Sequence, residues 1–413
     1  MMSADNLDYE VPQGLYAIPS DLLDLRPDDV VDQELVQHHP VTDDKNIWFY
    51  WHNGYKNMYP TAKRTVRSYH RRFSKLGWVV RVIDREPGSP LNITNIFDIS
   101  DLSMFPVAFR DGAIGSDYPA QVNSDLVRFP LLLRYGGLYA DTGVLPIGDL
   151  DRLWNESVAN PDSPYEIFTF GEANGQTVTN YFMAGKRNNA FFLRCHKFLI
   201  KLWSENGGRT SPADTHRSPL FKGQPLAGLD NPALTWTENG HVITHDEGCR
   251  MLTDYLFQGQ TINMVMGTVD EEDGWNGPQY GRDHVFAIDF LTGSQLINDL
   301  TAWNGPRQFE LLSLPMPANG EEETVDQKEA RKIVEECLRR SFAFKLATGL
   351  ILRVMGDTLG TLWKKNPESD NVPKTYAHWF RYATTHFSQN ELPKPVDVFL
   401  REPIKLGSLL GED

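Results

Sequence analysis

The segment NSDLVRFPLLLRYGGLYADTGVLPIGD, residues 123–149, combines a helix pattern, a turn and a strand. Four apolar residues recur at spacings of four, three and four, as expected for one face of a helix: Val122, Leu126, Phe129 and Leu133. The glycine pair at residues 136–137 should end this helix, because glycine tolerates the left-handed backbone of helix ends. The short apolar run that follows leads to Asp141. The order therefore predicts a helix, a tight turn and a strand that ends in a carboxylate.

Pro130 lies inside the predicted helix, where proline removes a hydrogen bond and strains the preceding turn. We therefore expect either a kink near Leu126 or a helix that begins close to it. Asp125 and Arg128 are three residues apart and can meet on one side of this helix. A surface ion pair is one interpretation. A ligand site is the other, because open α/β sheets bind ligands beyond the carboxyl ends of their strands, where Asp141 is expected.

This block resembles the core signature of glycosyltransferase family 32 and of the related capsular polysaccharide synthesis proteins. These proteins carry a serine-aspartate pair, an arginine three residues later, an apolar helix that ends in Tyr-Gly-Gly, and a strand that ends in an Asp-X-Asp motif. The resemblance implies an α/β fold of the GT-A type, a Rossmann-type mixed sheet flanked by helices, here with a helical C-terminal extension. It also implies an enzyme that transfers a sugar from a nucleotide-diphosphate donor to an acceptor, with retention of the anomeric configuration.

The resemblance also assigns roles to individual residues. Asp125, Arg128 and Asp141 match the family's catalytic and donor-binding residues. In the strand NIWFYW, Trp48 or Trp51 would lie against the nucleotide base, although core packing remains an alternative for each. Two further donor-binding residues follow from the resemblance: Asn180, the polar residue of a later strand, and Lys345, a diphosphate contact.

The family's Asp-X-Asp motif reads Asp141-Thr142-Gly143 in this chain, so its second aspartate, a direct manganese ligand in the family, is absent. A Mn²⁺ or Mg²⁺ ion would need other oxygen or nitrogen ligands. A late histidine or aspartate completes the metal shell in related enzymes. Of the candidates His245, Asp246, Asp283 and His284, we favour Asp283 and His284, because they immediately precede the strand-like VFAIDF. The predicted metal ligands are therefore Asp141, Asp283 and His284.

Three functions remain open on this evidence. In the first, Asp141 and a distant ligand such as His284 or Asp283 still hold the ion, and the protein transfers sugar. In the second, the ion is absent, and Arg128 or Lys345 carries the charge stabilisation that the leaving diphosphate requires. In the third, the fold no longer transfers sugar and serves as a binding module or catalyses another reaction, such as a cyclisation or an isomerisation.

The composition restricts the class of protein. The 413 residues have a formal net charge of -15, which argues against a nucleic-acid partner. The three cysteines are widely spaced and predict no disulfide framework. The N-terminus lacks the pattern of a signal peptide, and no run of about twenty apolar residues predicts membrane insertion. We expect a soluble, cytoplasmic protein whose partners are a nucleotide sugar and a small-molecule or glycan acceptor; the sequence does not define its oligomeric state.

Three regions are predicted along the chain. Residues 1–40 form an N-terminal extension, residues 41–310 the GT-A-like catalytic domain, and residues 311–413 a helical region packed on it. Within the catalytic domain, a basic helix over residues 61–76 connects a strand in the run NIWFYWHNG, residues 46–54, to a strand at residues 78–83, which indicates parallel strands. Apolar residues at spacings near four predict one further helix over residues 342–363.

Overall fold

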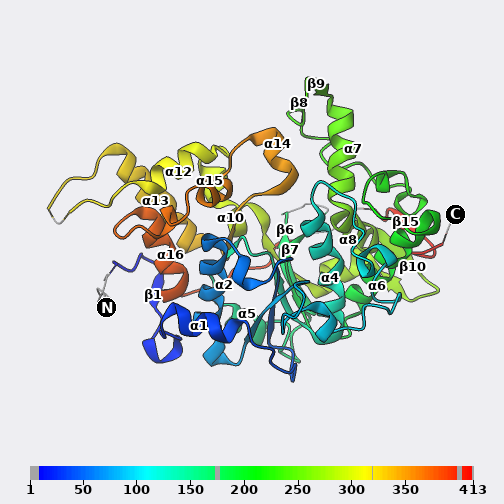
Figure 1. The fold of residues 1–413 in the computed structure, drawn as a ribbon, viewed down its shortest axis with the longest axis horizontal. Coiled ribbons are helices and arrows are strands. Elements are labelled where there is room, and N and C mark those ends of the chain that lie inside the picture. The colour runs from blue at the N-terminus through cyan, green and yellow to red at the C-terminus, as the bar shows by residue number, and fades with distance from the viewer. Residues whose placement is uncertain (1–8, 173–176, 319, 398–401, 412–413) are drawn as a thin grey trace.

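The computed structural model describes residues 9–172, 177–318, 320–397 and 402–411. Its centre is a six-stranded mixed sheet with the strand order β12-β6-β7-β4-β2-β3 (Figure 1). Only β7 runs antiparallel to its neighbours among these six strands. The strands are β2 (Asn46–Tyr50), β3 (Val79–Ile83), β4 (Gly137–Ala140), β6 (Ile167–Gly171), β7 (Val178–Gly185) and β12 (Val285–Asp289).

Helices cover both faces of this sheet (Figure 1). One face packs against α1 (Asp28–Leu35), α2 (Pro60–Phe73) and α5 (Leu150–Glu156). The other face packs against α4 (Pro119–Tyr135), α6 (Ala190–Ser204) and α8 (Phe257–Gly267). Because both faces are covered, the strands are mainly apolar, and several of their polar residues, such as Asn46, Arg81 and Thr169, are buried. The predicted α/β fold, a mixed sheet flanked by helices, is confirmed.

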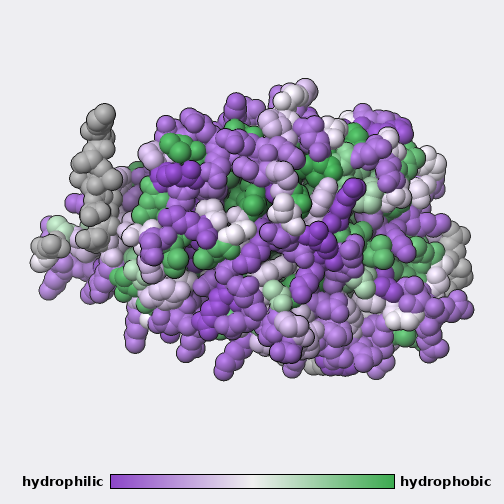
Figure 2. Space-filling model, turned by 90° about the horizontal axis from the view of Figure 1, so that it is seen from below, coloured by the Kyte–Doolittle hydropathy of each residue, from purple (hydrophilic) through white to green (hydrophobic). Residues whose placement is uncertain are grey.

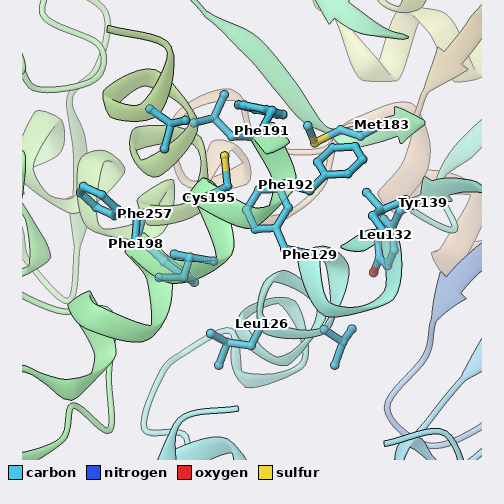
Figure 3. Close-up of a cluster of buried hydrophobic side chains, with 14 of the residues drawn as sticks. Leu126, Phe129, Leu132, Tyr139, Met183, Phe191, Phe192, Cys195, Phe198 and Phe257 are labelled. Carbon is cyan, nitrogen blue, oxygen red and sulfur yellow. The ribbon is translucent and has the colours of Figure 1, made fainter. Parts of the chain in front are cut away.

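The signature helix is α4, whose apolar side packs against α6 and the sheet. Leu126 and Phe129 of α4 lie in one buried cluster with Phe192 of α6 and Met183 of β7 (Figure 3). The ring centroids of Phe129 and Phe192 are 6.3 Å apart. Pro130 lies within the helix, which begins at Pro119, so the alternative that the helix begins close to Leu126 is wrong, whereas the kink near Leu126 stays a prediction. Packing on both sides of Pro130 maintains the helix across the position where its ring removes a hydrogen bond.

The glycine turn brings β4 into close contact with the neighbouring strand. A Cβ atom at Gly137 would lie 2.2 Å from the backbone oxygen of Asn46, and Gly137 has a φ of +99°. Any other residue here would clash with β2 and adopt a strained backbone conformation. The turn thus sets where β4 begins beside β2, and Asp141 follows four residues later.

The terminal regions pack on this central unit. In the described part of the N-terminal region, β1 (Leu15–Ala17) pairs with β14 (Phe387–Gln389), and α1 lies against α2. In the C-terminal region, β13 (Ala343–Lys345) pairs antiparallel with β5 (Val144–Pro146). Helices α12 (Gly305–Ser313), α13 (Val325–Arg340), α15 (Leu359–Lys365) and α16 (Tyr376–His386) share a separate apolar cluster. The boundaries at residues 40 and 310 stay predictions.

The continuous helix predicted over residues 342–363 is wrong. The chain instead forms β13, a short 3₁₀ turn, α14 (Leu352–Met355) and then α15. Gly349 and Gly356 interrupt the helix pattern with φ values of +85° and +71°. Residues 343–345 form a strand that pairs with β5, and this pairing buries the apolar side chains of Ala343 and Phe344 without a helix.

Smaller elements connect and cover the central layers. They are α3 (Val107–Arg110), α7 (His245–Tyr255), α9 (Gly277–His284), α10 (Phe290–Ser294), α11 (Leu296–Leu300), β8 (Trp236–Glu238), β9 (His241–Ile243), β10 (Thr268–Asp270), β11 (Trp275–Asn276) and β15 (Lys405–Leu406). The three cysteines are free and buried.

The surface is mainly polar. Figure 2 shows a face dominated by hydrophilic residues, with hydrophobic ones in scattered areas. Among the helices of the described residues, none combines the length and the apolar character that crossing a bilayer requires.

Candidate active site

Charged side chains from three separate elements converge at the carboxyl end of β4. Arg128 of α4 donates from Nη2 to Asp141 Oδ1 at 3.1 Å, and its Nη1 lies 3.2 Å from Asp125 Oδ1. Lys345 of β13 donates from Nζ to the second oxygen of Asp141, Oδ2, at 2.6 Å. The four residues thus form a row of alternating charge, Asp125, Arg128, Asp141 and Lys345. The structure brings together the three residues that the sequence assigns to catalysis.

Arg128 is the least accessible member of this row. It is 2% exposed, and its guanidinium group lies 4.5 Å from the centroid of the Tyr139 ring. The Tyr139 hydroxyl lies 2.6 Å from Ser124 Oγ, which holds that ring in place. A buried cation requires compensating partners. Two carboxylates and an aromatic face provide them here, so the guanidinium group is fixed before any ligand binds.

Gln258 of α8 connects Arg128 to Asn180 and to α4. Its Oε1 accepts a 2.5 Å hydrogen bond from Arg128 Nη1 and a 3.0 Å bond from Asn180 Nδ2. Its Nε2 donates to the backbone oxygen of Asp125 at 2.7 Å. Asn180, near the start of β7, also approaches Asp125 Oδ1 at 3.4 Å. Asn180 therefore lies beside the charged row, while Gln258 is a residue of this site that the sequence analysis did not identify.

Lys345 reaches the site because β13 pairs with β5, in a register that sets Lys345 opposite Val144. Its Nζ also lies 5.3 Å from the centroid of the Tyr181 ring. The Tyr181 hydroxyl in turn lies 2.6 Å from Ser294 Oγ. The C-terminal region thus contributes a positioned cation to a site that otherwise belongs to the central sheet.

The environment separates the two carboxylates chemically. Burial raises the pKa of Asp125 to about 7; the nearby Asp141 adds to this rise, and Arg128 opposes it. Burial also disfavours ionised Asp141, but the positive charges of Lys345 and Arg128 outweigh it and lower the pKa of Asp141. Asp141 is consequently ionised at neutral pH, whereas Asp125 is divided between its two forms. Carboxyl groups whose pKa values are pushed apart in this way take different roles in catalysis.

Part of the row remains accessible from outside. The side chain of Asp141 is 29% exposed, and those of Asp125 and Lys345 are each 14% exposed. A ligand can therefore contact two carboxylates and one ammonium group, while Arg128 acts from behind them. This arrangement suits an anionic ligand with several hydroxyl groups.

Several known proteins with similar sequences are named glycosyltransferases. The family model described as capsular polysaccharide synthesis protein matches residues 28–210. The O-glycosyltransferase braB of Annulohypoxylon truncatum is 32% identical over 400 residues, which are 95% of this chain and 92% of braB. The O-glycosyltransferase PaGT of Phomopsis amygdali is 31% identical over 400 residues, 93% of this chain and 92% of PaGT. The chain belongs to this family of glycosyltransferases.

A third relative supports the same conclusion. Glycosyltransferase afumC of Aspergillus fumigatus is 31% identical over 384 residues, 91% of this chain and 93% of afumC. Among solved structures, the PaToxG glycosyltransferase aligns with 43% of this chain and 69% of its own, at 14% identity and a TM-score of 0.27, too weak a likeness to compare the folds. The predicted enzyme class is confirmed, and the alternative of a fold used for another purpose is not favoured.

The two tryptophans assigned to base binding occupy different environments in this glycosyltransferase. Trp48 is 0% exposed, and its indole nitrogen donates to the backbone oxygen of Gly136 at 2.8 Å. Trp51 follows β2, is partly exposed and meets Tyr59 edge-on, with ring centroids 5.5 Å apart. Full burial excludes a contact between Trp48 and a base in this conformation. The base contact stays a prediction for Trp51.

The metal ligands predicted at Asp283 and His284 are placed wrongly. Both residues end α9 and precede β12, whose first residue pairs with Ile167 at the start of β6. Since β12 is parallel to β4 and Asp141 follows the carboxyl end of β4, they lie at opposite edges of the sheet. His284 Nδ1 instead lies 2.8 Å from the Pro164 backbone oxygen. At about 3.3 Å per strand residue, they cannot share an ion with Asp141.

The residues around Asp141 do not fit a divalent ion. Each carboxylate oxygen of Asp141 already pairs with a cation, and Gly143 supplies no side-chain ligand. Within the described residues, one group of three histidine, cysteine or acidic side chains has its ligand atoms within 4.8 Å of one another: Asp24, Glu34 and His70. Arg26 already donates to both oxygens of Asp24, at 2.8 and 3.1 Å. Mn²⁺ and Mg²⁺ prefer several oxygen ligands, and the charged row offers them two carboxylates that are each already paired with a cation.

Proposed function

We propose that this glycosyltransferase transfers a sugar from a nucleotide-diphosphate donor to a hydroxyl group of a small-molecule or glycan acceptor, with retention of the anomeric configuration. The observation that carries the proposal is the row Asp125, Arg128, Asp141 and Lys345 at the carboxyl end of β4. Two relatives are named O-glycosyltransferases, which supports a hydroxyl acceptor. Retention follows the resemblance described above.

The charges of the row match those that develop during transfer. As the bond between the anomeric carbon and the diphosphate breaks, negative charge accumulates on the leaving oxygen. Arg128 and Lys345 offer fixed positive charge, and groups that need no reorganisation stabilise a transition state most effectively. Ionised Asp141 holds both cations, at 3.1 and 2.6 Å.

Asp125 is suited to recognise the sugar. With a pKa of about 7, the carboxyl group of Asp125 occurs in both forms near neutral pH. Its protonated form can donate a hydrogen bond to a sugar hydroxyl oxygen, and its ionised form can accept one from a sugar hydroxyl group. Its pairing with Arg128 leaves it a poor nucleophile, because the guanidinium group competes for its electron pairs. Retention then requires the acceptor to attack from the face that the diphosphate leaves. The acceptor's hydroxyl proton passes to the departing phosphate oxygen as the new bond between the anomeric carbon and the acceptor oxygen forms.

The test measures release of nucleoside diphosphate from UDP-glucose, UDP-N-acetylglucosamine, UDP-galactose and GDP-mannose, with water accepting the sugar in place of the unidentified acceptor. We expect release from at least one donor, and a fall of about 100-fold or more in the variants Asp141→Ala and Arg128→Met. The matched control is Asp283→Asn, whose carboxylate pairs with Arg282 at the opposite edge of the sheet and should not affect the rate. Equal losses in Asp141→Ala and Asp283→Asn, or no release from any donor, would refute the proposal. The anomeric coupling constant of the product, measured by NMR, tests retention separately.

A further inference from the structure

We propose that this enzyme stabilises the leaving diphosphate without a divalent metal ion, and that the ammonium group of Lys345 occupies the position from which such an ion would act. The inference rests on the proposed nucleotide-diphosphate donor. It concerns how the charge of that donor is neutralised, which the family membership alone leaves open.

The first observation is where a side chain at the third motif position would point. A Cβ atom built at Gly143 lies 3.9 Å from Lys345 Nζ. A carboxylate at this position would therefore project toward the ammonium group. Lys345 occupies the region in which the second aspartate of an Asp-X-Asp motif would hold its ion.

The second observation is that Gly143 and Lys345 depend on each other sterically. The same Cβ atom would lie 3.3 Å from the backbone oxygen of Leu346, closer than ordinary van der Waals contact. The backbone N–H of Leu346 donates to the oxygen of Gly143 at 2.8 Å, which extends the pairing of β13 with β5. Glycine at position 143 thus permits the close approach that delivers Lys345. The absence of an aspartate at position 143 and the presence of Lys345 beside Asp141 are therefore linked through the packing of β13 against residue 143.

The third observation is the charge balance of the row. Two cations, Arg128 and Lys345, already face the ionised Asp141, each on its own oxygen. A divalent ion bound to Asp141 would meet both positive groups at short range and would have to displace one of them. Asp125 cannot offset this repulsion well, because its carboxyl group already pairs with Arg128 at 3.2 Å. A bound diphosphate, in contrast, would meet the ammonium group of Lys345 directly, with the buried guanidinium group of Arg128 behind Asp141.

One oxygen of a further carboxylate at the same edge of the sheet is also engaged in hydrogen bonds. Asp289 ends β12, and its Oδ1 accepts hydrogen bonds from the Thr292 backbone N–H at 2.8 Å and from Thr292 Oγ1 at 2.6 Å. These bonds cap α10 and orient Asp289 toward that helix. Replacement of the metal by Lys345 therefore explains the ligand set more simply than recruitment of a distant carboxylate.

The experiment measures binding of UDP and GDP to the full-length protein by isothermal titration calorimetry, once in EDTA and once in MnCl₂. We expect at least one of the two to bind with a Kd that differs by less than about threefold between the buffers. Lys345→Met should weaken that binding by about tenfold or more in both buffers. Lys197→Met, which removes an exposed lysine of α6, is the matched control and should bind as the unmodified protein does.

A second variant tests the exchange in the opposite direction. Gly143→Asp combined with Lys345→Met restores the acidic pair and removes the ammonium group, so nucleotide binding should now require MnCl₂. The unmodified protein alone decides the main point, even if a variant fails to fold. Nucleotide binding that EDTA abolishes would overturn metal independence but leave the donor proposal intact. Absence of UDP and GDP binding in both buffers would overturn the proposed donor, and this inference with it.

Discussion

Replacement of Gln258 by leucine should destabilise the site without removing any charged residue. Gln258 is fully buried, at 0% exposure. Its amide accepts from Arg128 Nη1 and Asn180 Nδ2 and donates to the backbone oxygen of Asp125. Leucine has a similar volume but neither accepts nor donates a hydrogen bond. The variant therefore separates hydrogen bonding from packing and from charge.

The expected loss follows from the partners that remain. Arg128 keeps both carboxylates, at 3.2 and 3.1 Å, whereas Asn180 Nδ2 keeps only the 3.4 Å contact with Asp125. A hydrogen bond to a charged group contributes about 1.5–3 kcal/mol and a neutral one about 0.5–1.5 kcal/mol. The three lost bonds thus sum to about 2.5–6 kcal/mol, and the more apolar leucine offsets about 1 kcal/mol or more of this. We expect the free energy of unfolding to fall by about 3 kcal/mol.

Urea unfolding followed by tryptophan fluorescence measures this change, with Gln279→Leu as the control. Gln279 is an exposed residue of α9, and its replacement should change the free energy of unfolding by less than about 0.5 kcal/mol. The rate of nucleoside-diphosphate release should fall as well, because Asp125 and Arg128 lose a common support. A Gln258→Leu variant within about 1 kcal/mol of the unmodified protein would refute the assigned hydrogen-bond network.

Two further predictions concern neighbouring groups. Burial raises the pKa of Asp125 to about 7 in the folded protein, above its value of about 4 in the unfolded chain. The folded protein therefore binds this proton more tightly, and its free energy of unfolding falls as the pH rises from about 4 to 7. Relative to Asp125→Asn, the unmodified protein should lose about 2–4 kcal/mol between pH 4 and pH 8 in urea unfolding; parallel pH profiles would contradict this. Gly349→Ala would place a Cβ atom 2.1 Å from Tyr255 Oη at a φ of +85°, and should lower the unfolding temperature, with partial recovery when Tyr255→Phe removes the hydroxyl group. An unchanged unfolding temperature for Gly349→Ala would show that this contact is absent.

The sequence predicts those parts of the site that local patterns determine. Asp125 and Arg128 share one side of a helix whose period is visible in the chain, and the glycine pair fixes where Asp141 emerges. The sequence does not identify Gln258 as a site residue, because its hydrogen-bond partners are 78 to 133 residues away and no spacing rule connects them. Its one local signal is a polar side chain within the largely apolar segment FQGQTINMVMG, where burial requires a hydrogen-bond partner.

Asp283 and His284 were misplaced for a reason that the topology makes clear. In the sequence they come immediately before a strand, whereas Asp141 comes immediately after one. In a sheet whose strands run parallel, residues before one strand and after another lie at opposite edges. The rule that ligands bind beyond the carboxyl ends of strands points to Asp289, which ends β12 at the same edge as Asp141.

The completeness of the site depends on contacts between distant parts of the chain. The family model spans residues 28–210, which include Asp125, Arg128, Asp141 and Asn180. Gln258 and Lys345 come from beyond that segment, on α8 and β13. Without Lys345, Arg128 would be the one cation of the row. The row would then carry more negative than positive charge once Asp125 and Asp141 were both ionised. Such a site would repel the diphosphate that it is proposed to bind, so the pairing of β13 with β5 is as much a condition for donor binding as the signature helix itself.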